Sequence, residues 1–145
     1  MSKVLVSYFS FTGKTKSLAE AAAEGARSAG ADVVVKDAAS TDIQDFSNAD
    51  AVLIATPQTF GTMAAETKRL FERLWGNRET LGQGKRFYSI VTHATGPAPT
   101  VELLDKLGGY FGFAKGAESV TVPVAELEAG KERCQQLGAA AAKSG

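Results

Sequence analysis

The stretch from residue 8 to residue 15, Tyr-Phe-Ser-Phe-Thr-Gly-Lys-Thr, constrains the fold more than any other part of the sequence. An apolar run from Val4 to Phe9 precedes the turn, and an alanine-rich pattern with helical spacing follows it, from about Lys14 to Ala29. The first amides of a helix have no partner inside the helix, and they carry the positive end of its dipole. The stretch therefore predicts a strand, loop and helix whose loop binds an anion such as a phosphate.

Side chains of the loop add to this anion site. Ser10, Thr12 and Thr15 contribute hydroxyl donors, Gly13 lies at the turn, and Lys14 contributes a positive charge. Two other interpretations stay open. One is an ordinary helix cap and turn, because serine and threonine favour both. The other is the end of a nucleoside-triphosphatase loop.

The triphosphatase interpretation meets two obstacles. The tripeptide Gly13-Lys14-Thr15 matches the end of that motif, but the motif requires a glycine five residues before Gly13, where this chain has Tyr8. In addition, no later strand ends in an aspartate that would hold magnesium. We therefore favour a simple phosphate loop.

The rest of the chain alternates between strand and helix patterns. We expect strands at residues 4–9, 32–36, 51–55, 86–92 and 119–122, and helices at about 14–29, 41–46, 63–75, 100–110 and 127–142. Such alternation is typical of an α/β fold, in which helices cover both faces of a parallel sheet. The chain length is that of one domain, so we expect a single domain over residues 1–145.

The loop also resembles the phosphate loop of flavodoxins and related FMN proteins, an aromatic residue followed by Ser-x-Thr-Gly-x-Thr. This sequence departs from the family in having Ser7 at an apolar strand position and Lys14 in place of the usual asparagine. The resemblance implies FMN as the cofactor. It also implies a flavodoxin-like three-layer sandwich, with a five-stranded parallel sheet of order 2-1-3-4-5 and the ligand at the carboxyl ends of strands one and three.

The loop after the third strand is expected to meet the flavin ring. Within the expected loop at residues 56–62, the candidate cofactor-binding residues are Pro57, Gln58, Thr59, Phe60 and Gly61. The segment resembles the Pro-x-x-Phe-Gly-x-Met segment of flavodoxin-like quinone reductases, and Phe60 or Met63 could lie against a flat heterocycle. The alternative is a proline turn whose phenylalanine belongs to the core.

The loop after the fourth strand supplies the last candidates, His93, Ala94, Thr95 and Gly96. We expect its amides and the Thr95 hydroxyl to follow the pyrimidine edge of the ring. It lacks the tyrosine that classical flavodoxins usually place there, which leaves one ring face open to a nicotinamide or a quinone. His93 is either a proton donor near the ring or a cap on an exposed loop. A single histidine without a cluster argues against a metal site.

Composition narrows the classes of partner. Lysines plus arginines equal acids, 16 against 16, so no basic surface attracts nucleic acid and no acidic surface favours basic redox partners. No apolar run approaches the roughly 20 residues of a membrane span. The single cysteine, Cys134, fits a reducing compartment, and the start of the chain reads as a strand and not a signal peptide. We therefore expect a cytoplasmic protein.

Three functions stay open from the sequence. The first is an FMN-binding electron-transfer protein that serves a redox partner protein or a small-molecule acceptor. The second is an FMN-dependent NAD(P)H oxidoreductase that acts on quinones, and the third is a binding domain that keeps the fold without the flavin. Self-association into a homo-oligomer is compatible with each.

Overall fold

The computed structural model describes residues 2–143. The strands are β1 (Lys3–Tyr8), β2 (Asp32–Asp37), β3 (Ala51–Thr59), β4 (Thr62–Met63), β5 (Arg86–His93), β6 (Ala114–Lys115) and β7 (Val120–Pro123). The α-helices are α1 (Lys14–Ser28), α2 (Ile43–Asn48), α3 (Ala65–Leu74), α4 (Ala98–Tyr110) and α5 (Leu127–Lys143). Three short 3₁₀ helices span Ala38–Ser40, Trp75–Asn77 and Val124–Glu126. None of the helices within residues 2–143 is long and apolar enough to cross a membrane.

The sheet has the predicted order. Strands β2, β1, β3 and β5 are parallel neighbours, and β6 and β7 share the fifth position by pairing with opposite ends of β5. The expected fifth strand is therefore split. Between its two pieces, Gly116 lies so close to the ring of Tyr88 that a Cβ on it would be 2.2 Å from Cζ of that ring. The remaining strand, β4, is antiparallel to β3.

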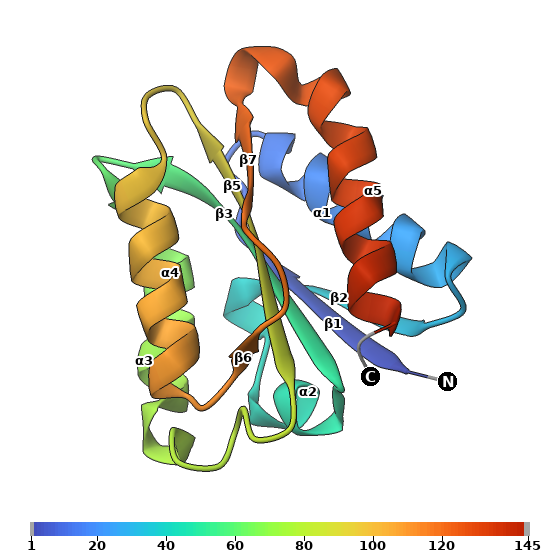
Figure 1. Ribbon diagram of the computed structural model, residues 1–145. Coiled ribbons are helices and arrows are strands. Elements are labelled where there is room, and N and C mark those ends of the chain that lie inside the picture. Colours follow the sequence, from blue (N-terminus) through green and yellow to red (C-terminus); the bar gives the residue numbers. More distant parts are fainter. Residues whose placement is uncertain (1, 144–145) are drawn as a thin grey trace.

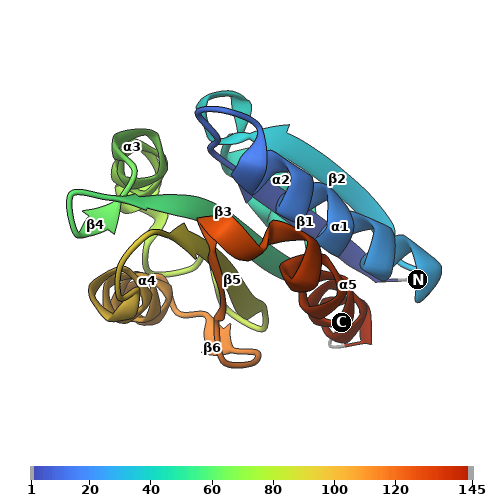
Figure 2. The same ribbon diagram turned by 90° about the horizontal axis from the view of Figure 1, so that it is seen from above.

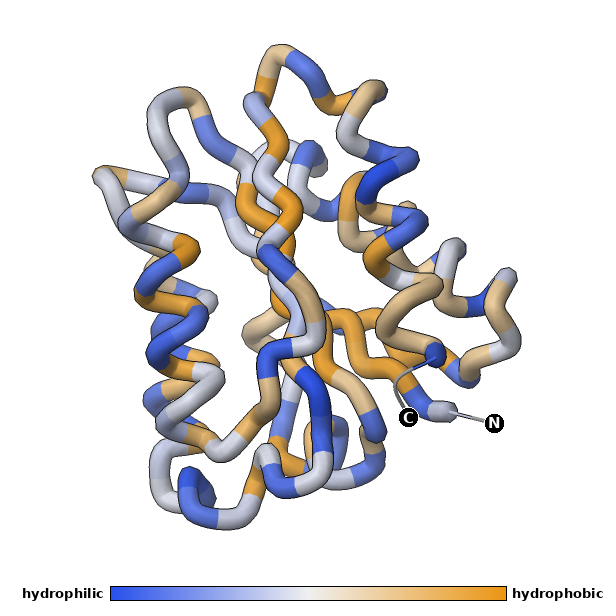
Figure 3. The backbone as a smooth tube through the Cα atoms, in the orientation of Figure 1, coloured by the Kyte–Doolittle hydropathy of each residue, from blue (hydrophilic) through white to orange (hydrophobic). Residues whose placement is uncertain are grey.

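Helices cover both faces of the sheet. α1 and α5 form one outer layer, and α2, α3 and α4 form the other (Figures 1 and 2). Successive strand residues serve opposite faces, so that Val4 and Val6 contact the α1 and α5 layer while Leu5 contacts the other layer. Burial on both faces explains why these strands are continuous apolar runs. Figure 3 shows that hydrophobic residues are concentrated in the central strands.

Small residues let α1 and α5 pack with their backbones close together. A Cβ on Gly138 of α5 would lie 1.8 Å from the carbonyl oxygen of Ala22, and a Cβ on Gly25 of α1 would lie 1.9 Å from that of Gln135. Real side chains do not tolerate such approaches to backbone atoms, so each glycine is required by packing. This contact fixes the height of α1 over the sheet, and with it the position of the loop that precedes α1.

We predict that Gly138→Ala lowers the free energy of unfolding by about 1–3 kcal/mol, because the added methyl group forces the two helices apart. Urea denaturation of the variant and the wild type measures the change. Gly109→Ala on α4 is the matched control, since a Cβ there would meet nothing within 4 Å. The packing argument is wrong if the two substitutions have the same effect.

Candidate functional site

The three loops predicted to bind a ligand leave the same edge of the sheet (Figure 1). Tyr8 at the end of β1 is in register with Ala55 of β3, and Pro57 of β3 is in register with Thr92 of β5. Because all three strands are parallel, their carboxyl ends lie at the same edge of the sheet, and β3 and β5 extend past the level of Tyr8. In sheets of this kind, ligands bind outside the carboxyl ends of the strands, at the point where the strand order reverses.

The first loop has the backbone geometry of an anion site. Gly13 precedes α1 with a left-handed φ of 95°, and it carries no side-chain cap for the helix. The first amide to reach a helical acceptor is that of Ser17, which donates to the Gly13 carbonyl oxygen at 3.0 Å. Within residues 2–143, the amides of Lys14, Thr15 and Lys16 have no such acceptor, as expected for a first turn.

Side chains of this loop supply donors and no carboxylate. Thr12 and Lys14 are exposed, and the first turn of α1 contains no acidic residue. Ser10 Oγ accepts a hydrogen bond from the Gly13 amide at 3.0 Å, which leaves the Ser10 proton free to be donated to an anion. Acidic residues stabilise the first turn of a helix, because they interact with the positive end of its dipole. A lysine in that turn is therefore destabilising unless an anion is bound. The donor set thus fits a phosphate group.

Thr15 differs from the other hydroxyl residues of the loop because it is buried. Its Oγ1 lies 2.9 Å from Oγ1 of Thr92, which is also buried. Sequence reasoning identified Thr15 and missed Thr92. A threonine within an apolar strand pattern has no local signal that separates a polar contact from ordinary strand propensity.

The second loop is a β-hairpin, so the expectation that residues 56–62 all belong to a loop is wrong. β3 continues through Thr59, which pairs with Thr62 of β4, and the turn consists of Phe60 and Gly61 with φ values of 51° and 80°. Two consecutive positive φ values are what a two-residue hairpin turn requires. Phe60 is fully exposed at its tip, so it is not a core residue. Met63 is buried in this structure, and its contact with a flat heterocycle stays a prediction.

Gln58 ties the hairpin to the third loop. Its Nε2 donates to the Gly96 carbonyl oxygen at 2.9 Å, and its Oε1 accepts from the Thr100 hydroxyl at 2.6 Å. Both ends of the predicted cofactor-binding amide are therefore engaged by protein groups. Gln58 holds the third loop beside β3, while Pro57 and Thr59 lie on the strand, half-buried.

The third loop presents exposed backbone above the end of β5. Ala94, Thr95 and Gly96 are exposed, and His93 is half-buried beside Pro123 of β7. The His93 Nδ1 atom is buried, and it is the one buried side-chain nitrogen or oxygen of the described part of the chain that lacks a hydrogen-bond partner. No aromatic side chain belongs to this loop, as the sequence showed.

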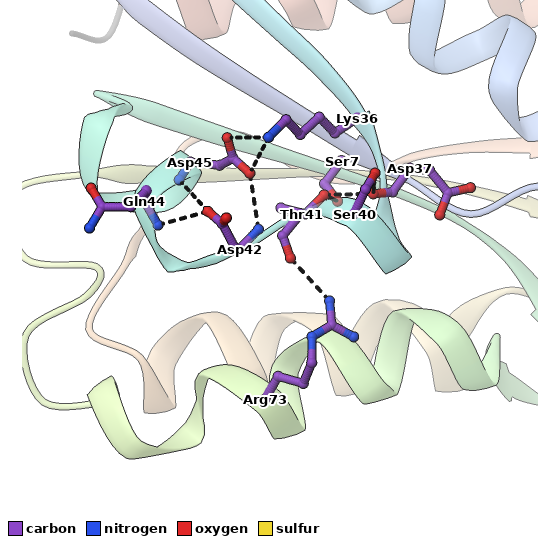
Figure 4. Close-up of polar contacts among 9 residues, drawn as sticks. All are labelled: Ser7, Lys36, Asp37, Ser40, Thr41, Asp42, Gln44, Asp45 and Arg73. Carbon is purple, nitrogen blue, oxygen red and sulfur yellow. Dashed lines mark hydrogen bonds and ion pairs between the residues drawn. The ribbon is translucent and has the colours of Figure 1, made fainter.

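Polar contacts brace the neighbouring end of β2 (Figure 4). The Thr41 hydroxyl donates to the Asp37 carbonyl oxygen at 2.8 Å, so the buried Ser7 hydroxyl must donate to Thr41 Oγ1, also at 2.8 Å. Arg73 of α3 donates to the carbonyl oxygens of Ala38 and Thr41. These bonds explain why Ser7 replaces an apolar residue, since it links β1 to the segment between β2 and α2.

An ion pair also joins β2 to α2. Lys36 Nζ lies 2.9 Å from Asp45 Oδ1 and 3.0 Å from Oδ2, and the Asp42 amide donates to Asp45 Oδ2 at 2.9 Å. Burial alone would raise the pKa of Asp45 and is the largest single influence on it. The hydrogen bond from Asp42 and the contacts of Lys36 together outweigh burial, so the pKa of Asp45 lies below its ordinary 3.8. The ionised carboxylate therefore stabilises the folded state.

We predict that Asp45→Asn lowers the free energy of unfolding at neutral pH, while Asn keeps an acceptor for the Asp42 amide. Because the Asp45 pKa is lower in the folded than in the unfolded chain, its contribution is present above pH 3.8 and is lost as the pH falls through the folded pKa. Thermal unfolding of both proteins between about pH 7 and about pH 2 should show the difference shrinking in acid. A difference that is constant with pH contradicts this account. Glu128→Gln, in an exposed pair with Lys131, is the control.

Comparisons with known proteins agree with this geometry. The family model named Flavodoxin matches residues 6–97, more than half of the chain. A protein named NAD(P)H dehydrogenase (quinone) from Cupriavidus metallidurans is 33% identical over 125 residues, which cover 70% of this chain and 63% of that protein. The chain thus spans less than two thirds of that relative's length.

Solved structures extend the likeness to the whole fold. A flavodoxin of Streptococcus pneumoniae has 25% identity and a TM-score of 0.84, with 98% of each chain covered. A WrbA-like flavodoxin of Agrobacterium tumefaciens, at 22% identity, has a TM-score of 0.83 over 99% of this chain and 96% of the other, which shows the fold alone. From the family match and this geometry we conclude that the chain belongs to the flavodoxin family.

Proposed function

We propose that the protein binds FMN at the carboxyl edge of its sheet and transfers electrons through it, as a small flavodoxin-type carrier. The observation that carries the proposal is the first loop, where a left-handed Gly13 opens the first turn of α1 toward donors and a lysine, with no carboxylate. The likeness to a flavodoxin over nearly all of both chains supports it. FMN, when bound, supplies the redox chemistry, and the protein binds and orients it.

In this proposal the first loop binds the phosphate group of FMN. The amides of Lys14, Thr15 and Lys16, with the hydroxyls of Ser10 and Thr12, hold the phosphate. The ammonium of Lys14 adds charge attraction, which family members with asparagine at that place lack. Phosphate oxygens accept such charge-assisted hydrogen bonds strongly.

The other two loops shape the place of the ring. Phe60 offers an exposed aromatic face next to Gly61, and aromatic side chains pack well against flat heterocycles. The exposed amides of Ala94, Thr95 and Gly96 are donors for the polar edge of the ring. Gln58 keeps these two loops at a fixed separation by its hydrogen bond to Gly96.

A second candidate function is reduction of quinones by NAD(P)H. It is favoured by the 33% identity to a protein named NAD(P)H dehydrogenase (quinone). The third loop has no aromatic side chain to cover the ring, so one ring face would be open to a nicotinamide or a quinone. NADPH oxidation by the FMN-loaded protein alone, with a quinone as acceptor, distinguishes the two functions. Rapid turnover establishes the reductase, and reduction of an acceptor protein without turnover of NADPH supports the carrier.

We predict that Thr12→Ala weakens FMN binding roughly 10- to 100-fold, because a hydrogen bond to a charged group is lost. Lys14→Asn should weaken it less, and the loss should shrink as salt is added, because the lysine is exposed. Titration of the apoprotein with FMN and with riboflavin, followed by flavin fluorescence, measures both effects. Riboflavin affinity should not change, since riboflavin lacks the phosphate.

The control for the charge is Lys106→Asn, an exposed lysine on α4. It should leave FMN binding as in the wild type. A wild-type protein that binds riboflavin as tightly as FMN, or a Thr12→Ala variant with unchanged FMN affinity, would remove the assignment of this loop to the phosphate.

Phe60 yields a separate prediction because its backbone is unfavourable for a phenylalanine. Residues other than glycine, asparagine and aspartate rarely adopt a positive φ, so Phe60→Asn should raise the free energy of unfolding of the apoprotein by about 1 kcal/mol. The same variant should lose affinity for FMN and riboflavin by an equal factor, since the side chain is proposed to contact the ring. Calorimetry and fluorescence titration test the two effects, with Tyr110→Asn as an exposed aromatic control. Unchanged affinity for both flavins means that Phe60 does not contact the ring.

A further inference from the structure

The hydroxyls of Thr15 and Thr92 join two segments that lie 77 positions apart in the sequence. Thr15 is the second residue of α1, and Thr92 is near the carboxyl end of β5. Their Oγ1 atoms are 2.9 Å apart, and each side chain is only 2% exposed. Neither hydroxyl has another hydrogen-bond partner among residues 2–143. The two groups therefore depend on each other.

A hydroxyl carries one proton, so one member of this pair donates and the other accepts. Helix side chains lean toward the amino end of their helix, which places the Thr15 hydroxyl on the side of the first loop. If Thr15 donates to Thr92, its oxygen turns only lone pairs toward that loop, and these repel a phosphate oxygen. If Thr92 donates, the Thr15 proton is free to be donated to the phosphate.

We propose that Thr92 is a positioning residue for the phosphate site. It donates to Thr15 Oγ1 and so directs the Thr15 proton toward the phosphate of the flavin nucleotide. This inference rests on the proposed function, because it needs a phosphate in the first loop. It adds that Thr92, at the end of β5, does not itself contact the phosphate. Thr92 nevertheless sets how strongly the protein prefers FMN over riboflavin.

The pair also couples two parts of the ligand site. The same β5 that carries Thr92 leads at once into the third loop through His93, Ala94 and Thr95. A hydrogen bond between its end and the first turn of α1 therefore fixes the separation between the phosphate donors and the amides proposed for the ring. Loss of that bond should affect the phosphate preference first, since the loop itself is still held by Gln58.

The test compares variants that remove or keep the hydroxyl. Thr92→Val keeps the shape but cannot donate, and Thr92→Ser keeps the donor. Affinities for FMN and for riboflavin are measured by fluorescence titration of each apoprotein, whose thermal unfolding confirms that it is folded. We expect Thr92→Val to lose about tenfold in FMN affinity with riboflavin affinity unchanged, as for one hydrogen bond to a charged system. Thr92→Ser should restore the FMN affinity to within about twofold of the wild type.

A double substitution tests whether Thr92 acts through Thr15. If it does, Thr15→Val with Thr92→Val binds FMN no more weakly than Thr15→Val alone, so the two effects are not additive. Additive losses, equal losses for both flavins, or a Thr92→Ser variant as weak as Thr92→Val would each overturn the inference. Should Thr92→Val not fold, Thr92→Ala against Thr92→Ser makes the same comparison.

Failure of this inference differs from failure of the proposed function. A wild type without preference for FMN over riboflavin overturns both. A preference that Thr12→Ala removes and Thr92→Val leaves intact overturns the role of Thr92 alone.

Discussion

The position of α1 is the constraint on which the rest of the structure depends. Alanines such as Ala19, Ala22 and Ala26 are fully buried between the sheet and α5, so the helix packs close to its neighbours along most of this face. The helix is therefore fixed at both faces, and its first turn lies at the carboxyl edge of the sheet. Amides that the helix cannot satisfy, and the positive end of its dipole, are presented at that edge. The same packing that builds the core thus creates the anion site.

Neutral hydrogen bonds join the separate segments of the site. Ser7 with Thr41, Thr15 with Thr92, and Gln58 with Gly96 each link segments that are far apart in the sequence. Buried hydroxyl and amide groups lose less hydration free energy than buried charges, so they suit an edge that packs against apolar strands. The chain has equal numbers of acidic and basic residues, which is consistent with this design. Within the loop from Ser10 to Thr15, Lys14 is the one charged residue.

Local patterns in the sequence were sufficient for the alternation of strands and helices, while the sheet order was implied by the resemblance to flavodoxins. The alanine stripe after Lys14 and the continuous apolar residues 51–55 have clear periods, and their alternation leaves few topologies. The hairpin was missed because Phe60 and Gly61 lack the asparagine-glycine signal of such turns. The tether of Gln58 and the role of Thr92 were also missed, because each depends on a partner at least 38 residues away. Local sequence patterns do not indicate hydrogen bonds between residues that are so far apart in the chain.

The central claim is that backbone amides at the start of α1 hold the phosphate of a flavin nucleotide. The most direct measurement is a nuclear magnetic resonance titration of the ¹⁵N-labelled apoprotein with FMN and, separately, with riboflavin. The account predicts that the amide resonances of Lys14, Thr15 and Lys16 shift strongly with FMN and little with riboflavin. Shifts that are equal for the two flavins, or that leave these three amides unchanged, would contradict it.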